Sequence, residues 1–281
     1  MTAARTPMSG GLAGRLAILA VVLLAVTWML PLAWVFAASF KPNAVLMVRT
    51  DGLLAPPFTL ANYGNLIGTS SLVRWLTNSA IVALGQTAGV LILSSLAGYG
   101  FARTRFPGKQ WVFGFVLAGL AVPEHAILIP LHRLIAGLEL HNTYTALILP
   151  RLAIPFGVYL MTQYFKAIPR DLEEAALLDN ASRLKIFLRI VLPMSLPAQA
   201  TLGIFSFLTA WNDYVWPLVS ATRPDMYTLT VGLGSIQTNF AQAEGIGFLM
   251  AQAVFAGLPI FIVYLFFQKH IVAAVSGTTA G

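Results

Sequence analysis

The sequence predicts an all-α polytopic membrane protein with six transmembrane helices and both termini in the cytoplasm. The first observation is composition. Of 281 residues, 58% are hydrophobic and only 10% are charged, with a mean hydropathy of +0.78, whereas soluble domains carry roughly 25% charged residues. The second observation is that six apolar runs are long enough to cross a bilayer as helices. The third is that the most basic loops can be placed on one side of the membrane.

Composition also excludes several classes of protein and site. So few charges cannot cover the surface of a soluble enzyme or a nucleic-acid-binding domain, and the chain is too apolar to be disordered. The net charge of +7 therefore indicates Lys and Arg kept in cytoplasmic loops. Because the chain has no cysteine, disulfides, thiolate metal sites, Fe–S clusters and cysteine nucleophiles are excluded.

Four runs without charged residues predict spans directly: 16–40, 75–102, 190–212 and 245–268. The first is too long for a cleaved secretory signal, so we expect it to be an anchor. The second contains Gly85 and Gly89 at GxxxG spacing, which is common in membrane helices, and a patch of small residues around Gly98. Such residues let helices approach closely in lipid. The run 190–212 is expected to enter the membrane only after Pro193.

Two further runs contain charged residues: 111–131 includes Glu124 and His125, and 142–165 includes Arg151. The basic loops on either side of this region should both be cytoplasmic, which requires an even number of crossings between them. The lengths of the two runs favour two spans over none. On this topology 11 of the 17 Lys and Arg residues are cytoplasmic. The outer segment 42–73 carries turn signals at Pro56-Pro57 and Asn62-Tyr63-Gly64-Asn65.

The cytoplasmic loop 166–189 contains nine of the charged residues of the chain, which has 17 Lys or Arg and 10 Asp or Glu. The pattern predicts two short helices. Pro169 suits the start of the first, the acidic residues after it match the positive end of the helix dipole, and Asn180 can end it in the left-handed conformation. Ser182 can cap the second helix, which runs to Pro193. An amphipathic helix on the lipid surface explains the composition equally well.

The order of residues in this loop favours a more specific interpretation. Glu174-Ala175-Ala176 is followed after three residues by Asn180, after nine more by Ile190, and after one more by Leu192-Pro193. This pattern resembles the EAA loop of binding-protein-dependent ABC importer permeases, which has the same spacing and Gly in place of Asn180. Asn also adopts the required backbone geometry, so we expect the turn to be kept.

The resemblance covers nearly the whole chain and is to the carbohydrate-uptake branch, similar to the smaller permease subunit of the maltose importer. The other segments that carry it are Asn78-Ser79, Ala97-Gly98-Tyr99, Phe101-Ala102-Arg103, Phe106-Pro107-Gly108-Lys109, Ile129-Pro130-Leu131, Asn142-Thr143-Tyr144, Leu149-Pro150, Pro155-Phe156-Gly157, Ala210-Trp211-Asn212-Asp213 and Trp216-Pro217-Leu218.

The resemblance implies a type I ABC importer permease fold in the bacterial inner membrane. The expected parts are a tail, first helix and outer loop over 1–73, a five-helix permease domain over 74–269, and a cytoplasmic tail over 270–281. The permease domain includes the coupling loop at about 166–193.

The resemblance also implies partners. In this family two permease subunits form the pore, two ATP-binding subunits lie beneath them, and an extracytoplasmic solute-binding protein delivers the substrate. The EAA helix docks in a cleft of the ATPase, so that ATP-driven closure opens the pore outward. The residues expected to make this contact are Glu174, Ala175, Ala176, Asp179 and Asn180. The chain has no G-x-x-x-x-G-K-[ST] motif, so we expect a transport subunit without a cofactor, and the partner uses the ATP.

Polar residues in or near the spans should face the bundle or water, because they are costly in lipid. They are Glu124, His125, His132, Arg133, Arg151, Asn212 and Asp213. Such residues either line a substrate path or mark outer helix ends. The candidate translocation path is Trp211, Asn212, Asp213 and Tyr214, whose rings could stack on sugars or belong to an interfacial aromatic belt. No metal site is expected, because the histidines at 125, 132 and 141 lack the i, i+4 spacing of helical zinc ligands.

The leading function is the permease subunit of an ATP-driven ABC importer for a sugar or a related polyhydroxy solute. The alternative is an ion-coupled secondary transporter that uses Glu124, Arg151 and Asp213 as coupling groups. Such a carrier has no use for an EAA loop, and many carriers show an inverted repeat that is not evident here. An intramembrane enzyme is disfavoured, because G-x-S-x-G and H-E-x-x-H are missing from the sequence. The sequence does not identify the sugar, polyol or sugar phosphate.

Overall fold

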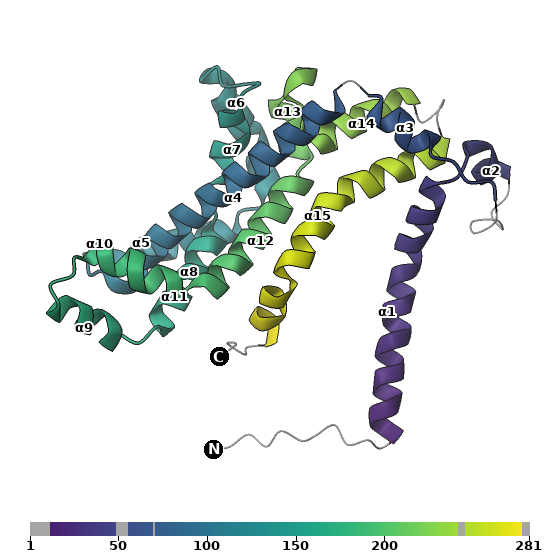
Figure 1. The fold of residues 1–281 in the computed structure, drawn as a ribbon. Coiled ribbons are helices and arrows are strands. Elements are labelled where there is room, and N and C mark those ends of the chain that lie inside the picture. Colours follow the sequence, from purple (N-terminus) through teal and green to yellow (C-terminus); the bar gives the residue numbers. More distant parts are fainter. Residues whose placement is uncertain (1–11, 49–55, 70, 241–244, 277–281) are drawn as a thin grey trace. The chain divides into compact units, whose positions relative to one another are not determined.

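A computed structural model describes residues 12–48, 56–69, 71–240 and 245–276. The regular secondary structure in these ranges is helical, and they contain no strand (Figure 1). The all-α class is therefore confirmed. Residues 1–11 of the expected N-terminal tail and residues 277–281 of the expected C-terminal tail lie outside the described residues.

Three helices are each long and apolar enough to cross a membrane without interruption. They are α1 (Leu12–Ser39), α4 (Leu72–Arg103) and α15 (Gly245–Ser276). Their apolar stretches correspond to the expected runs 16–40, 75–102 and 245–268. These three spans are confirmed by length and composition.

The other three expected runs form bent pairs of helices rather than straight spans. In the first pair, α5 (Lys109–Ala118) and η1 (Gly119–Ala121) meet η2 (Glu124–Ile127) and α6 (Leu128–Gly137) at 95°. In the second, α7 (Tyr144–Ile148) and η3 (Leu149–Arg151) meet α8 (Pro155–Ala167) at 50°. In the third, α10 (Arg183–Ile186), the π-helical turn η4 (Phe187–Val191) and α11 (Leu192–Met194) meet α12 (Leu196–Asn212) at 75°. Six spans result if each bent pair crosses the membrane once.

Prolines explain where these three runs bend. Pro123 directly precedes η2, Pro155 opens α8, and Pro197 lies in the first turn of α12. Proline lacks the N–H that continues a helix. Val122 and Ile154, which precede Pro123 and Pro155, also have extended backbones, whereas Leu196 before Pro197 is already helical. A count of apolar residues detects the length of each run but not this change of direction.

The remaining helices are short. They are α2 (Asn43–Val48), α3 (Ala61–Ile67), α9 (Asp171–Leu178), α13 (Val215–Ser220), η5 (Pro224–Met226) and α14 (Leu229–Phe240). The chain divides into two compact units, 1–69 with 236–257 and 70–235 with 258–281. Every candidate functional residue named above lies in the second unit.

Asn62 organises the described part of the first unit. Its buried amide donates to the carbonyl oxygens of Ser39 at 2.8 Å and Lys41 at 3.0 Å, directly after α1. The prediction of a turn at Asn62-Tyr63-Gly64-Asn65 is wrong, because these residues lie within α3. Buried backbone carbonyls need donors, and a helix that presents Asn62 to the end of α1 supplies them.

Close packing of α4 against α8 and α12 forms the centre of the second unit (Figure 1). A Cβ atom placed on Gly98 would lie only 2.7 Å from Cβ of Met161 in α8. Real Cβ atoms do not approach so closely, so this contact requires glycine. The expected close approach at the small-residue patch is therefore confirmed.

Candidate functional site

The helix α9 and the turn after it reproduce the expected local structure of the loop 166–193. Asn180 adopts a left-handed conformation with φ of 56°. The amides of Asn180 and Ala181 donate at 3.0 Å to the carbonyls of Leu177 and Ala176, which closes the end of α9. The hydroxyl of Ser182 accepts from the amide of Lys185 at 3.3 Å and caps the next helix. The second helix is not uniform, because its middle is the π-helical turn η4.

One face of α9 is open to the surroundings. Glu174, Ala175, Asp179 and Asn180 are exposed. The same helix exposes three leucines by 42%, 47% and 85%: Leu172, Leu177 and Leu178. Exposed leucines beside carboxylates are typical of a surface that another protein covers.

The opposite face of α9 packs on the chain itself. Ala176 is half-buried against a core cluster that includes Phe165 of α8 and Phe187 of η4. Of the five residues expected to contact a partner, Ala176 is the one that faces inward here. The expected face of small residues is thus divided between the two sides of α9.

A buried ion pair joins α9 to the end of α4. The guanidinium Nε of Arg103 lies 2.6 Å from Oε1 of Glu173, and the two side chains are 6% and 12% exposed. Arg103 Nη2 also donates to the carbonyl oxygen of Ile168 at 2.6 Å. The hydroxyl of Tyr99 donates to Oε2 of Glu173 at 3.4 Å. Arg103 and Tyr99 therefore hold both oxygens of Glu173 and the chain just before α9.

Aromatic packing surrounds this ion pair. The ring centroid of Tyr99 lies 4.9 Å from that of Phe187 and 6.2 Å from that of Phe165. The sequence pattern alone indicates no role for Tyr99, Arg103 or Glu173. The available signal was the i, i+4 spacing of Tyr99 and Arg103, which places them on one face of α4.

A second charged cluster joins three helix ends. Arg151 Nη2 lies 3.0 Å from Oδ2 of Asp213, and Arg151 Nη1 pairs with the carboxylate of Glu124. Glu124 opens η2 at the first bend, Arg151 ends η3 at the second, and Asp213 follows the last residue of α12. Three of the seven polar residues expected to avoid lipid thus meet each other. Arg151 and Asp213 are each 18% exposed and Glu124 is 52% exposed.

The four candidate path residues have different surroundings. Trp211 is buried and stacks on Phe207, with ring centroids 5.6 Å apart. The amide of Asn212 donates to the carbonyl of Leu208 at 2.9 Å in the last turn of α12. Asp213 belongs to the charged cluster, and Tyr214 is 43% exposed. Tyr214 is the member of this set whose ring is exposed.

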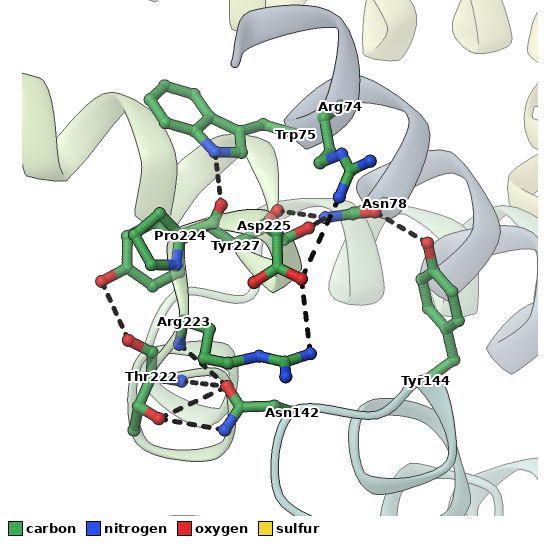
Figure 2. A network of polar contacts seen from close by, with 10 residues as sticks. All are labelled: Arg74, Trp75, Asn78, Asn142, Tyr144, Thr222, Arg223, Pro224, Asp225 and Tyr227. Carbon is green, nitrogen blue, oxygen red and sulfur yellow. Dashed lines mark hydrogen bonds and ion pairs between the residues drawn. The ribbon is translucent and has the colours of Figure 1, made fainter.

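A polar network fixes residues 222–227 against α4 and α7 (Figure 2). The amide of Asn78 in α4 donates to the carbonyls of Asp225 at 2.9 Å and Tyr227 at 2.8 Å. The hydroxyl of Tyr144 in α7 donates to Oδ1 of the same Asn78 at 2.8 Å. One buried side chain therefore joins three segments that are distant in the sequence.

The same network extends to both sides of Asn78. Oδ1 of Asn142 accepts from the amides of Thr222 at 2.7 Å and Arg223 at 2.8 Å, and Trp75 Nε1 donates to the carbonyl of Pro224 at 2.9 Å (Figure 2). Two of the short motifs noted in the sequence, at residues 78–79 and 142–144, meet in this network. Their side chains organise the fold at this end of α4.

Comparison with known proteins gives consistent results. Residues 90–277 match the family described as binding-protein-dependent transport system inner membrane component. The arabinooligosaccharides transport system permease protein AraQ of Bacillus subtilis is 34% identical over 263 residues, which cover 92% of each chain. The trehalose/maltose transport system permease protein MalG of Thermococcus litoralis is 33% identical, and the match covers 95% of each chain.

A solved structure confirms the expected fold. It is a chain of a bacterial ABC transporter involved in the import of the acidic polysaccharide alginate. The TM-score is 0.80, and the match covers 96% of this chain and 99% of that one. Because the sequences are only 22% identical, the likeness shows the type I importer fold alone.

Proposed function

Because the chain belongs to the family of binding-protein-dependent transport system inner membrane components, we propose that it forms half of the translocation pore of an ATP-driven importer. A second permease subunit forms the other half. Two ATP-binding subunits drive the pore, and an extracytoplasmic solute-binding protein supplies the solute. The ATP-binding subunits use the ATP, since the sequence of this chain has no G-x-x-x-x-G-K-[ST] motif.

The observation that carries this proposal is the open face of α9. Its exposed carboxylates and leucines form a short surface with the chemistry of a protein contact, and Asn180 sets the turn that presents it. Glu174, Ala175 and Asp179 contact the ATP-binding subunit directly. Glu174 offers a carboxylate to a basic residue of that subunit, and Ala175 lets the backbones approach closely.

The proposed solute is a carbohydrate or a related polyhydroxy compound. The names of the two relatives refer to arabinooligosaccharides and to trehalose and maltose, which supports this class. Tyr214 is the residue of the candidate path best placed to stack on a sugar ring, because 43% of it is exposed. The solute-binding protein contributes most of the selectivity.

Glu174→Lys and Ala175→Trp test the proposed contact with the ATP-binding subunit. Each should abolish ATP-dependent uptake and reduce co-purification of the ATP-binding subunits, because charge reversal or a large ring blocks close docking. The measurements are uptake in vesicles and the subunit content of the purified complex. Membrane insertion should stay normal.

The matched control is Glu139→Lys, which makes the same charge change at an exposed position outside α9. It should leave co-purification and uptake unchanged. Undiminished ATP-dependent uptake by both α9 variants would show that α9 is not the contact.

A further inference from the structure

The open face of α9 and its buried face carry consecutive acidic residues with opposite surroundings. Glu174 is exposed, whereas the side chain of Glu173 is 12% exposed and paired with Arg103. Neighbouring residues of an α-helix point about 100° apart, so one turn of α9 can meet a partner and α4 at the same time. α9 is therefore not a loop helix held only by its flanking chain.

We propose that Arg103 and Tyr99 are positioning residues that join α9 to α4, so that the two helices move as one rigid body. This inference rests on the coupling role proposed for α9 above. When an ATP-binding subunit displaces α9, the ion pair transmits this movement to the C-terminal end of α4. Without the ion pair, the turns on either side of α9 absorb the displacement and the pore does not follow.

The chemistry of the contact fits positioning better than simple stabilisation. Burying a guanidinium and a carboxylate costs desolvation energy that apolar residues of similar volume avoid. What the charged pair adds is position. Nε of Arg103 faces Oε1 of Glu173 as an ion pair without hydrogen-bond geometry, whereas Nη2 donates a hydrogen bond to the carbonyl of Ile168. Arg103 therefore ties both the first turn of α9 and the chain before it to α4. A lysine has a single nitrogen and cannot hold both partners at once.

The route from this contact into the membrane is continuous. α4 runs without a break from Leu72 to Arg103, which corresponds to about 48 Å at the rise of an α-helix. It packs along α8 and α12, and its far end carries Asn78 in the network of Figure 2. A displacement applied at Arg103 is therefore applied to a single helix in the middle of the second unit.

The test uses the complete importer reconstituted in vesicles with its ATP-binding subunits and solute-binding protein. The variants are Arg103→Lys, Glu173→Gln and Tyr99→Phe. In each, the ATP-binding subunits should co-purify as in the wild type and ATP hydrolysis should continue. The ATP consumed per solute imported should rise at least about fivefold for Arg103→Lys and Glu173→Gln, within the range by which residues along a coupling route change it. Tyr99→Phe should have a smaller effect, because its hydrogen bond is the longer one.

Arg105→Lys is the matched control, because Arg105 lies two residues away and is exposed. It should leave the ratio of ATP to solute unchanged. The double variant Arg103→Met/Glu173→Leu guards against misfolding, since it leaves no buried charge unpaired. It should assemble normally and show the same raised ratio.

Two results would overturn the proposal. One is a wild-type ratio in the double variant, which would show that α9 moves α4 without the ion pair. The other is loss of the ATP-binding subunits in the double variant, which would mean that the pair serves assembly. Failure of the coupling role itself has a different signature, namely normal co-purification and uptake in Glu174→Lys.

Discussion

At the scale of single residues, Arg151 has a demanding position. It is one guanidinium shared by two carboxylates, and its side chain and that of Asp213 are mostly buried. Each of the three residues lies where a helix begins or ends. The cluster therefore holds the ends of three broken segments together by charge.

Arg151→Met should destabilise the protein by about 3 kcal/mol, because it leaves Asp213 buried without its partner. The measurement is the thermal unfolding temperature of the purified protein in detergent. Arg223→Met is the control, because Arg223 pairs with Asp225 with its side chain 61% exposed, and exposed pairs contribute only about 0–1 kcal/mol. Equal unfolding temperatures for the two variants would contradict the role assigned to Arg151.

At the scale of elements, most helices follow from local sequence rules, and their breaks follow from prolines. The turn at Asn180 and the cap at Ser182 are predicted because each depends on one residue type in one backbone geometry. The Arg103–Glu173 pair is not predicted, because it joins residues 70 positions apart and depends on how α4 and α9 pack. The helix α3 is missed for the same reason, since the role of Asn62 appears only beside the end of α1.

The contact between α4 and α8 gives a prediction at this scale. Gly98→Ala should lower the unfolding temperature, because the new methyl group would lie 2.7 Å from Cβ of Met161 and 3.0 Å from backbone atoms. Gly100→Ala is an ideal comparison, since a Cβ at Gly100 meets no atom within 4 Å. That change should be neutral or stabilise α4 by up to about 1 kcal/mol, because alanine favours helix over glycine. Equal shifts of the unfolding temperature in the two variants would contradict the close packing at Gly98.

At the scale of the whole molecule, sequence composition is sufficient for the membrane class, and the spacing of the EAA loop is sufficient for the family. The coupling residues are implied by the resemblance of that loop to the EAA loop, and they stay a prediction. Composition cannot show that Glu124, Arg151 and Asp213 meet, because they come from three separate spans. The alternative of an ion-coupled carrier invoked these three residues as coupling groups, whereas in the structure they pair with one another.

The energy source separates these two functions experimentally. Thermal-shift screening of the cognate solute-binding protein against sugars identifies a substrate, and its uptake is then followed in cells. Uptake should persist when a protonophore collapses the proton gradient and should stop when ATP is depleted, because the partner ATPase drives the pore. Uptake that stops with the protonophore while ATP remains high would contradict the assignment.

The three bends of the spans have a consequence for water. Hydrocarbon offers no hydrogen bonds, so backbone groups released where a helix stops can exist at membrane depth only beside protein or a hydrated cavity. The bends lie at residues 122–123, 152–154 and 195. The same prolines that redirect the chain therefore exclude lipid tails from these three places. At membrane depth, each of these places must lie beside protein or a hydrated cavity.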